Sequence, residues 1–391
     1  MSPAERRVGV GLSAIYALRM LGLFLLLPVF SLYAATLSGG DNLMWVGLAL
    51  GAFGATQAVL QIPLGMASDR IGRKPVIVMG LLVFAIGCIM AVYADNIFML
   101  TIARVVQGAG AISAAVTALA ADLTREQHRT KIMAMIGSSI ALAFALSMVV
   151  APTLYALIGM GGIFWLTGGL ALAAILLVLK GLPPEPEKHS VAVTTRFVDV
   201  LKNPQLLRLN FGVFVLHVMQ TALWVVVPSL LLQKTGLPAA EHWKAYLPAV
   251  LLSLVIMVPA IIAAEKRGKM KSVFVMSIAL LLLMQLGMAF FNQTAWLIGL
   301  WLTVFFIGFN ILEATQPSLI IRIAPADVKG AAMGLYNTVQ SVGLFVGGAL
   351  GGALAHWGGA LALHAASAVL ALVWLFMAVS MNIPAARRII R

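Results

Sequence analysis

The chain has 391 residues, of which 62% are apolar and only 10% are charged, with a mean hydropathy of +1.02. A soluble domain carries roughly 25% charged residues, so a chain this poor in charge cannot cover a surface that faces water. The composition therefore excludes an ordinary soluble protein and predicts a protein whose solvent is lipid.

The apolar residues form long continuous runs, which are typical of transmembrane helices. About 20 apolar residues cross roughly 30 Å of hydrocarbon as a helix, whereas a membrane β-barrel shows short segments of alternating polarity. We predict an all-α membrane protein with twelve transmembrane helices, at 8–37, 43–66, 75–94, 97–121, 131–159, 161–180, 206–233, 243–264, 272–291, 294–321, 330–356 and 359–381. The single cysteine, Cys88, falls inside the third span, so we expect no disulfide.

The positive charges lie almost entirely on one side of these spans. Of the 26 lysines and arginines, 22 fall at the two termini, around the central linker and in every second loop. Lys234 and Lys244 fall in the opposite loops, and Arg19 and Arg104 fall within spans. The positive-inside rule therefore predicts that both termini and the linker are cytoplasmic. The net charge of +13 then reflects topology, and we expect the lipid bilayer as a partner and no nucleic acid.

The second half of the chain repeats the first. Residues of matching type recur at a spacing of 200, or of 196 around the second and eighth spans; examples are Pro28 with Pro228, Gly108 with Gly308, Pro63 with Pro259 and Gly72 with Gly268. We predict two pseudo-symmetric six-helix bundles, at 1–180 and 206–391, joined by a cytoplasmic linker at 181–205. Parallel repeats of this kind favour a transporter whose site lies near mid-membrane between the halves.

The linker begins with two prolines, Pro183 and Pro184, which end the sixth helix. Further on, Phe197, Val200 and Leu201 recur at helical spacing. We expect a short amphipathic helix there that lies on the lipid headgroups.

Two motifs carry a resemblance to a known family. The segment Gly65–Pro75 reads GMASDRIGRKP and resembles the signature loop G-x-L-x-D-R-x-G-R-K of the major facilitator superfamily. The segment Arg104–Gly108 reads RVVQG and is similar to the R-x-x-Q-G motif of the proton-coupled exporters in that family. The resemblance extends over essentially the whole chain and is nearest to the drug/proton antiporter branch, in particular to the YajR-type efflux proteins.

The resemblance implies the major facilitator fold, in the inner (plasma) membrane, with transport by alternating access in a monomer. Helices 1, 4, 7 and 10 surround the central cavity in that fold. Members of the YajR type carry a small soluble domain after the twelfth helix; this sequence ends at Arg391, so we expect that this domain is either absent or was removed.

In such proteins the signature loop latches the two halves together on the cytoplasmic face. A carboxylate at Asp69 suits the positive end of a helix dipole, and the family points to the helix that starts near Gly330. Arg73 is suited to a bidentate pair with Asp122 at the end of the fourth span. The alternative is that these are ordinary positive-inside charges. The expected latch consists of Gly65, Asp69, Arg70, Gly72, Arg73, Lys74 and Asp122.

Few ionisable residues fall inside the spans. They are Arg19, Arg104, His217, Glu313 and His364. A charge at the centre of a span costs about 2.5–3.5 kcal/mol on insertion scales, so each should face a partner or water. The first four fall on helices 1, 4, 7 and 10. We predict a cavity for protons and substrate formed by Glu313, Arg104, Arg19, His217, Gln107 and Asn310.

The roles within this cavity follow from the side-chain chemistry. Glu313 is the single acid well inside a span, and it is predicted to carry protons; alternatively it is a permanently ionised partner of Arg19 or Arg104. His217 either relays protons or caps the cytoplasmic end of its helix. Arg19 either holds a substrate anion or biases a neighbouring carboxylate.

The sequence shows no motif that is typical of an enzyme, a metalloprotein or a nucleotide-binding protein. The sequence has no His/Cys/Asp/Glu grouping with metal-ligand spacing and no phosphate-binding glycine loop, so we expect no enzyme, no metal and no cofactor. The sequence predicts a secondary active transporter, with proton-coupled efflux of small amphipathic or drug-like molecules. The alternative is proton-coupled or facilitated transport of a nutrient or lipid-like metabolite.

The predicted topology can be checked by labelling single introduced cysteines in intact cells. Cysteines in 38–42 and 234–242 should react with an impermeant reagent from outside, and cysteines in 181–205 and at both termini should react only after permeabilisation. Labelling of the linker in intact cells would contradict the architecture.

Overall fold

The computed structural model describes residues 1–185, 197–325 and 328–382, and these are almost entirely helical. The first half contains α1 (Pro3–Phe24), α2 (Leu27–Ala34), α3 (Leu43–Ile71), α4 (Arg73–Val92), α5 (Ile97–Ala109), α6 (Ser113–Asp122), α7 (Glu126–Leu176) and a π-helical turn, η1 (Leu177–Gly181). The second contains α8 (Phe197–Lys202), α9 (Pro204–Thr235), the 3₁₀ turn η2 (Ala239–Glu241), α10 (Trp243–Lys266), α11 (Met270–Phe290), α12 (Ala295–Ile323) and α13 (Lys329–Val379).

Ten helical stretches of the described residues are long and apolar enough to cross a membrane. Two of the helices, α7 and α13, have 51 residues each, and each is kinked at a glycine with positive φ: 66° at Gly159 and 64° at Gly359. A helix of this length extends about 75 Å, more than twice the hydrocarbon thickness. Each of these two helices therefore supplies two spans, and the prediction of an all-α protein with twelve spans is confirmed.

The repeat seen in the sequence reappears in the backbone. Gly159 and Gly359 are 200 residues apart and bend their helices at the same place in each half. Gly72 and Gly268, paired at a spacing of 196, both have positive φ, at 111° and 66°. Only glycine adopts such angles readily, so these turns explain the residue type at all four positions.

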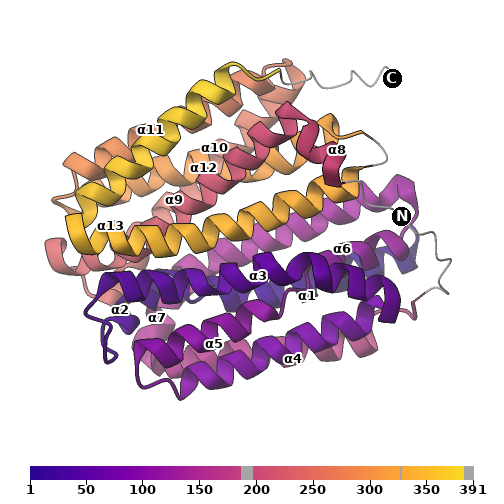
Figure 1. Cartoon of the computed structure of the whole chain (residues 1–391), viewed down its shortest axis with the longest axis horizontal. Helices are drawn as coiled ribbons and strands as arrows, with labels where there is room; N and C mark the ends of the chain where they lie inside the picture. The colour runs from indigo at the N-terminus through magenta and orange to yellow at the C-terminus, as the bar shows by residue number, and fades with distance from the viewer. Residues whose placement is uncertain (186–196, 326–327, 383–391) are drawn as a thin grey trace.

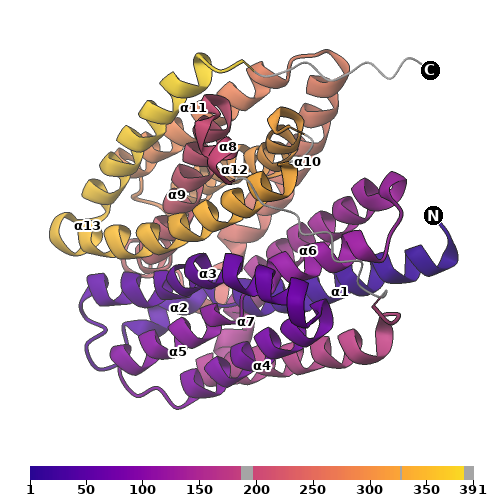
Figure 2. The ribbon, with the colours of Figure 1, turned by 45° about the vertical axis from the view of Figure 1, so that its right-hand side comes forward.

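The helices form two bodies that meet along α3 and α13 (Figure 1). Figure 2 shows α1–α7 on one side of this contact and the helices of the second half on the other. The contact is made by glycines: a methyl group added at Gly51 would lie 2.6 Å from the carbonyl oxygen of Phe345, and one at Gly54 would lie 2.6 Å from that of Ser341. Small residues of this kind let membrane helices approach at backbone distance. We call this contact, formed by Gly47, Gly51 and Gly54 of α3 with Ser341, Phe345, Gly348 and Gly352 of α13, the glycine seam.

The apolar cores show that the two halves pack together at one end only. One cluster of buried side chains combines both halves and joins Phe30 and Phe144 to Trp224 and Phe306. In the part of the chain that the structure describes, the other cluster contains first-half residues alone and includes Val8, near the start of α1. The closed end is the one where α3 begins. In the predicted orientation this is the external end, and we predict that the open end faces the cytoplasm.

The linker is described only in part, since 186–196 lie outside the described residues. The helix expected in it corresponds to α8, which begins at Phe197. Val200 is buried and belongs to the same apolar cluster as Leu206, so this side chain packs on protein. Contact of α8 with headgroups stays a prediction.

The glycine seam can be tested with Gly51→Ala. The added methyl group would meet the backbone of α13, and overpacking of this kind costs about 1–3 kcal/mol, so the melting temperature should fall and cross-links across the closed end should weaken. Gly299→Ala in α12 is the matched control, because nothing lies within 4 Å of the new methyl group. Equal melting temperatures for the two variants would show that the seam tolerates the methyl group.

Candidate functional site

A carboxylate, an imidazole and an amide meet in the second half. Glu313 of α12 has its Oε2 3.6 Å from Nε2 of His217 on α9. Gln340 of α13 has its Nε2 2.7 Å from the same His217 nitrogen and 3.5 Å from Glu313 Oε1. We call Glu313, His217 and Gln340 the acid–imidazole site. It joins three helices, α9, α12 and α13.

The hydrogen bonds of His217 assign its neutral tautomer. Nδ1 lies 2.9 Å from the carbonyl oxygen of Val213, which can only accept, so Nδ1 carries the proton. Nε2 then accepts from the Gln340 amide. If Nε2 also carried a proton, it would become a donor and could no longer accept from Gln340. It could then donate to Glu313, or to the side-chain oxygen of Gln340 if that amide turned over.

Close packing brings these side chains together. A methyl group at Gly343 of α13 would lie 2.7 Å from the Phe214 carbonyl oxygen and 3.1 Å from Cβ of His217, so glycine lets α13 touch α9 here. His217 is buried, whereas the Glu313 side chain is 38% exposed. The Glu313 side chain is thus partly exposed, although its Oε2, the oxygen that faces His217, is buried.

Two arginines are buried in the first half. Arg19 of α1 and Arg104 of α5 are each 1% exposed. Arg19 Nη2 donates to Gln57 Oε1 at 3.2 Å and to the Gly110 carbonyl oxygen at 3.3 Å. That carbonyl is free because the helix breaks between α5 and α6. Arg104 Nη1 donates to Gln107 Oε1 at 2.6 Å.

An aromatic ring separates the two arginines. The guanidinium carbons of Arg19 and Arg104 lie 5.9 Å and 5.1 Å from the centroid of Phe53, and Arg104 lies 5.6 Å from that of Phe30. Cation–π contact is favourable at such distances. In the described residues neither arginine forms an ion pair with a carboxylate. We call Arg19, Arg104 and Phe53 the arginine pair.

Gln57 connects the arginine pair to the second half. Its Oε1 accepts from Arg19, and its Nε2 donates to Ser341 Oγ of α13 at 3.1 Å. Ser341 in turn donates to the carbonyl oxygen of Asn337 at 3.0 Å. This polar contact between the halves lies at the inner end of the glycine seam, one residue from Gln340.

The structure thus separates the predicted cavity residues into two groups. The pairing of Glu313 with Arg19 or Arg104, one of two alternatives from the sequence, is wrong for this structure, since the carboxylate lies beside His217. His217 is midway along α9, so the capping alternative is also wrong. Asn310 donates to Ser253 Oγ at 2.9 Å instead of joining the acid–imidazole site.

Sequence reasoning missed Gln57 and Gln340. Neither side chain ionises, and the two amides that the sequence did indicate, Gln107 and Asn310, each lie three residues from a charged residue of the spans. An amide in an apolar span needs hydrogen-bond partners as much as a charge does, so the polar amides of the spans were the signal that could have found them. His364, by contrast, is buried beside Gln285, with Nδ1 and Oε1 2.7 Å apart, which indicates a structural role.

The signature loop is organised around Arg73. It forms an ion pair with Asp69, and its Nε lies 3.0 Å from Asp122 Oδ2. Its Nη1 also donates to Ser68 Oγ at 2.7 Å. The Asp69 side chain is 61% exposed, and the described residues show no hydrogen bond from it to the first turn of α13. The latch between the halves therefore stays a prediction.

Another carboxylate caps the helix that follows the loop. Glu185, at the start of the linker, accepts from the backbone N–H groups of Arg73 at 2.9 Å and Lys74 at 2.5 Å, at the N-terminus of α4. An anion is favoured there by the helix dipole. Lys74 Nζ also donates to the Leu182 carbonyl oxygen at 3.0 Å, so the linker is held against the signature loop.

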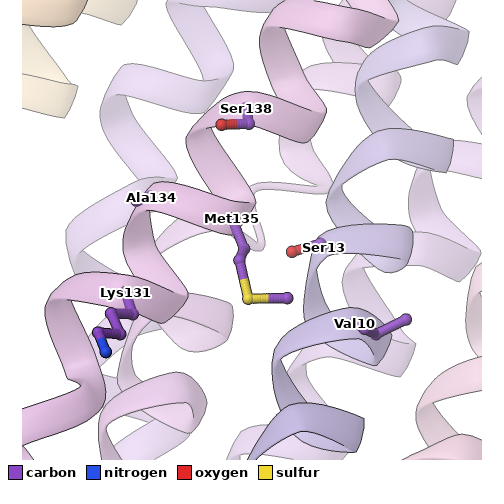
Figure 3. Close-up of a pocket in the computed structure, with 6 residues that line it drawn as sticks. All are labelled: Val10, Ser13, Lys131, Ala134, Met135 and Ser138. Carbon is purple, nitrogen blue, oxygen red and sulfur yellow. The ribbon is translucent and has the colours of Figure 1, made fainter. Parts of the chain in front are cut away.

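A groove of about 520 Å³ lies between α1 and α7 at the open end, and Figure 3 shows Met135 pointing across it towards Ser13. It is lined by Val10, Ser13, Lys131, Ala134, Met135 and Ser138. It contains none of the predicted cavity residues, so the candidate site lies deeper, at the acid–imidazole site and the arginine pair.

Comparison with known proteins assigns the family. The sequence profile of the Major Facilitator Superfamily matches residues 12–348. The chain belongs to the Major Facilitator Superfamily. Its relatives include the inner membrane transport protein YajR of Escherichia coli (strain K12), which is 43% identical over 388 residues, 98% of this chain and 85% of that protein. They also include the multidrug resistance protein MdtH of Aeromonas salmonicida (strain A449), 26% identical over 361 residues, 90% of this chain and 89% of that protein.

Solved structures of this superfamily have the same fold. A bacterial homologue of the human lysosomal transporter Spinster, in an inward-facing and occupied conformation, superposes with a TM-score of 0.75 at 14% identity and covers 97% of each chain. The chain is therefore a membrane transporter by family, and its relatives are transporters and not enzymes.

The predicted latch can be tested with Asp69→Asn. Loss of this charge should weaken the outward-facing state, so transport should fall while expression is kept, and cysteine cross-links should report more of the inward-facing state. Asp41→Asn, at the opposite end of the spans, should change neither measurement. If transport and cross-linking are unchanged in Asp69→Asn, the loop does not act as a latch, and its charges only set the orientation of the chain in the membrane.

Proposed function

We propose that this chain is a proton-coupled secondary transporter that moves small amphipathic or drug-like molecules out of the cell by alternating access. The observation that carries the proposal is the acid–imidazole site. The single acid well inside a span lies beside a titratable histidine and not beside an arginine. We further propose that the protein works as a monomer in the inner membrane with both termini in the cytoplasm.

The partner of Glu313 decides what it can do. A carboxylate fixed to an arginine stays ionised, because the arginine never gives up its proton under physiological conditions. A carboxylate beside an imidazole has no such fixed cation, and we propose that Glu313 carries the coupled proton. The Glu313 side chain is partly exposed, and we propose that protons reach it through this exposed part.

The geometry also supports a link between protonation and movement of the halves. Gln340 contacts His217 and Glu313, and the next residue, Ser341, accepts the hydrogen bond from Gln57 of the first half. A change of proton at Glu313 alters the bonds of Gln340, and thus acts on α13 beside the glycine seam. Ligands shift a two-state equilibrium in this way when they bind the two states unequally.

The direction of transport rests on the relatives and on one motif. MdtH of Aeromonas salmonicida is named a multidrug resistance protein, and the Arg104–Gly108 motif is similar to that of proton-coupled exporters. Both support efflux of amphipathic molecules.

Glu313→Gln tests proton coupling. The variant mimics the protonated acid permanently, so exchange of substrate across proteoliposomes should survive while accumulation driven by a pH gradient should vanish. The measurement uses flux of ethidium, Nile red and fluorescein, which cover cationic, neutral and anionic substrates, together with the melting temperature. Glu241→Gln, an exposed acid paired with Lys244, is the matched control.

Three results of this experiment differ in meaning. A stable Glu313→Gln protein that exchanges but does not accumulate supports coupling. A stable variant that still concentrates a dye refutes it. A variant whose melting temperature collapses shows that Glu313 is a structural group.

A further inference from the structure

The arginine pair is a concentration of positive charge without a counter-charge. Both guanidinium groups are buried, and no carboxylate of the described residues pairs with either. Buried charges are normally paired, because removal from water is unfavourable for an isolated ion. The aromatic rings and amides around the pair reduce the free-energy cost of burying these charges, but they carry no net negative charge.

Several donors of the pair have no acceptor. Nε and Nη1 of Arg19 and Nε of Arg104 are buried and make no hydrogen bond. A guanidinium offers five N–H donors in a planar fork that matches a carboxylate. Nη1 of Arg19 shares the end of the planar fork with Nη2, which donates to Gln57, so these two nitrogens would hold a bidentate anion once Gln57 is displaced.

We propose that the transported molecule is an organic anion whose carboxylate binds the arginine pair. The inference rests on the proposed function of the chain as a transporter of small molecules, and it names the class of substrate. The apolar part of the molecule would lie against Met20 and Phe24, which follow Arg19 on α1 and are only half-buried. A thioether and a phenyl ring adapt to apolar groups of different shape.

Gln57 occupies the place that the anion would take. It is half-buried, it accepts from Arg19 at 3.2 Å, and it bridges to Ser341. A carboxylate is a stronger acceptor for a guanidinium than an amide oxygen is. A bound anion would displace Gln57 from Arg19, and the bridge between the halves would lose one of its two ends. Substrate binding would thereby favour separation of the glycine seam.

The first test compares three ligands that share one aromatic body. Calorimetry on the purified full chain in detergent should give 2-naphthoate an affinity at least tenfold higher than 2-naphthamide or 2-naphthylmethylamine. Equal affinity of the three ligands, or preference for the amine, overturns the proposal.

The second test uses variants of the pair. Arg19→Gln and Arg104→Gln should each lower the affinity for 2-naphthoate at least tenfold. Arg208→Gln, at an exposed arginine that donates to the Ser380 carbonyl oxygen, should leave it unchanged. Retained affinity in both pair variants overturns the proposal.

Gln57→Ala covers the case in which the arginine variants do not fold. Removal of the competing acceptor should raise the affinity for 2-naphthoate, and a merely structural glutamine would not produce such a gain. Unchanged or lower affinity in Gln57→Ala contradicts the displacement of Gln57 by the anion.

Binding and proton coupling are separable. Glu313→Gln should still bind 2-naphthoate, because the arginine pair lies in the other half. Naphthoate binding without proton-driven flux would leave this inference standing and reject the coupling. Proton-driven flux without a preference for 2-naphthoate would support the coupling and reject this inference.

Discussion

Backbone contact between α3 and α13 holds the two halves together at the closed end, and glycine makes that contact possible. A methyl group at Gly51 or Gly54 would collide with carbonyl oxygens of α13. Because lipid is as apolar as a leucine side chain, such close packing, and not the hydrophobic effect, joins helices in a membrane. The inner end of the seam is also where Gln57 meets Ser341. The position of the seam therefore fixes the distance between the polar groups of the two halves.

Those polar groups differ in charge between the halves. The first half buries two guanidinium groups around Phe53, and the second presents a carboxylate beside an imidazole. Each charge is unfavourable in the middle of a membrane, so a proton on the carboxylate and an anion on the guanidinium groups both reduce the electrostatic cost. In our proposal a proton and an organic anion would together set the charge of these two groups. The residues between the two groups, Gln57 and Gln340, are amides that can exchange donor for acceptor.

At the open end each half is tied within itself. Arg73 pairs with Asp122 in the first half, and Arg322 pairs with Glu265 at 2.8 Å in the second. Asp122 and Arg322 are 200 residues apart, whereas Glu265 corresponds to Asp69 at the spacing of 196, so an ion pair recurs at this place in each half with different partner residues. Such pairs join the ends of neighbouring spans and let each half move as one body, while the linker, held by Glu185, stays with the first half.

The sequence by itself determined the lipid solvent, the twelve spans, the repeat and the family, because each depends on composition, on run length or on residues close together in the chain. It also identified Glu313, Arg19 and Arg104, since a charge is conspicuous in an apolar run. Only the tertiary structure decided that Glu313 lies beside His217, that Arg19 lies beside Gln57, and that Glu185 caps α4. In a soluble helix, alternation of polar and apolar residues shows which side faces the core. In these spans the lipid side and the core side are both apolar, so the rotation of each helix about its axis, and with it every partner in the cavity, is set by packing between helices.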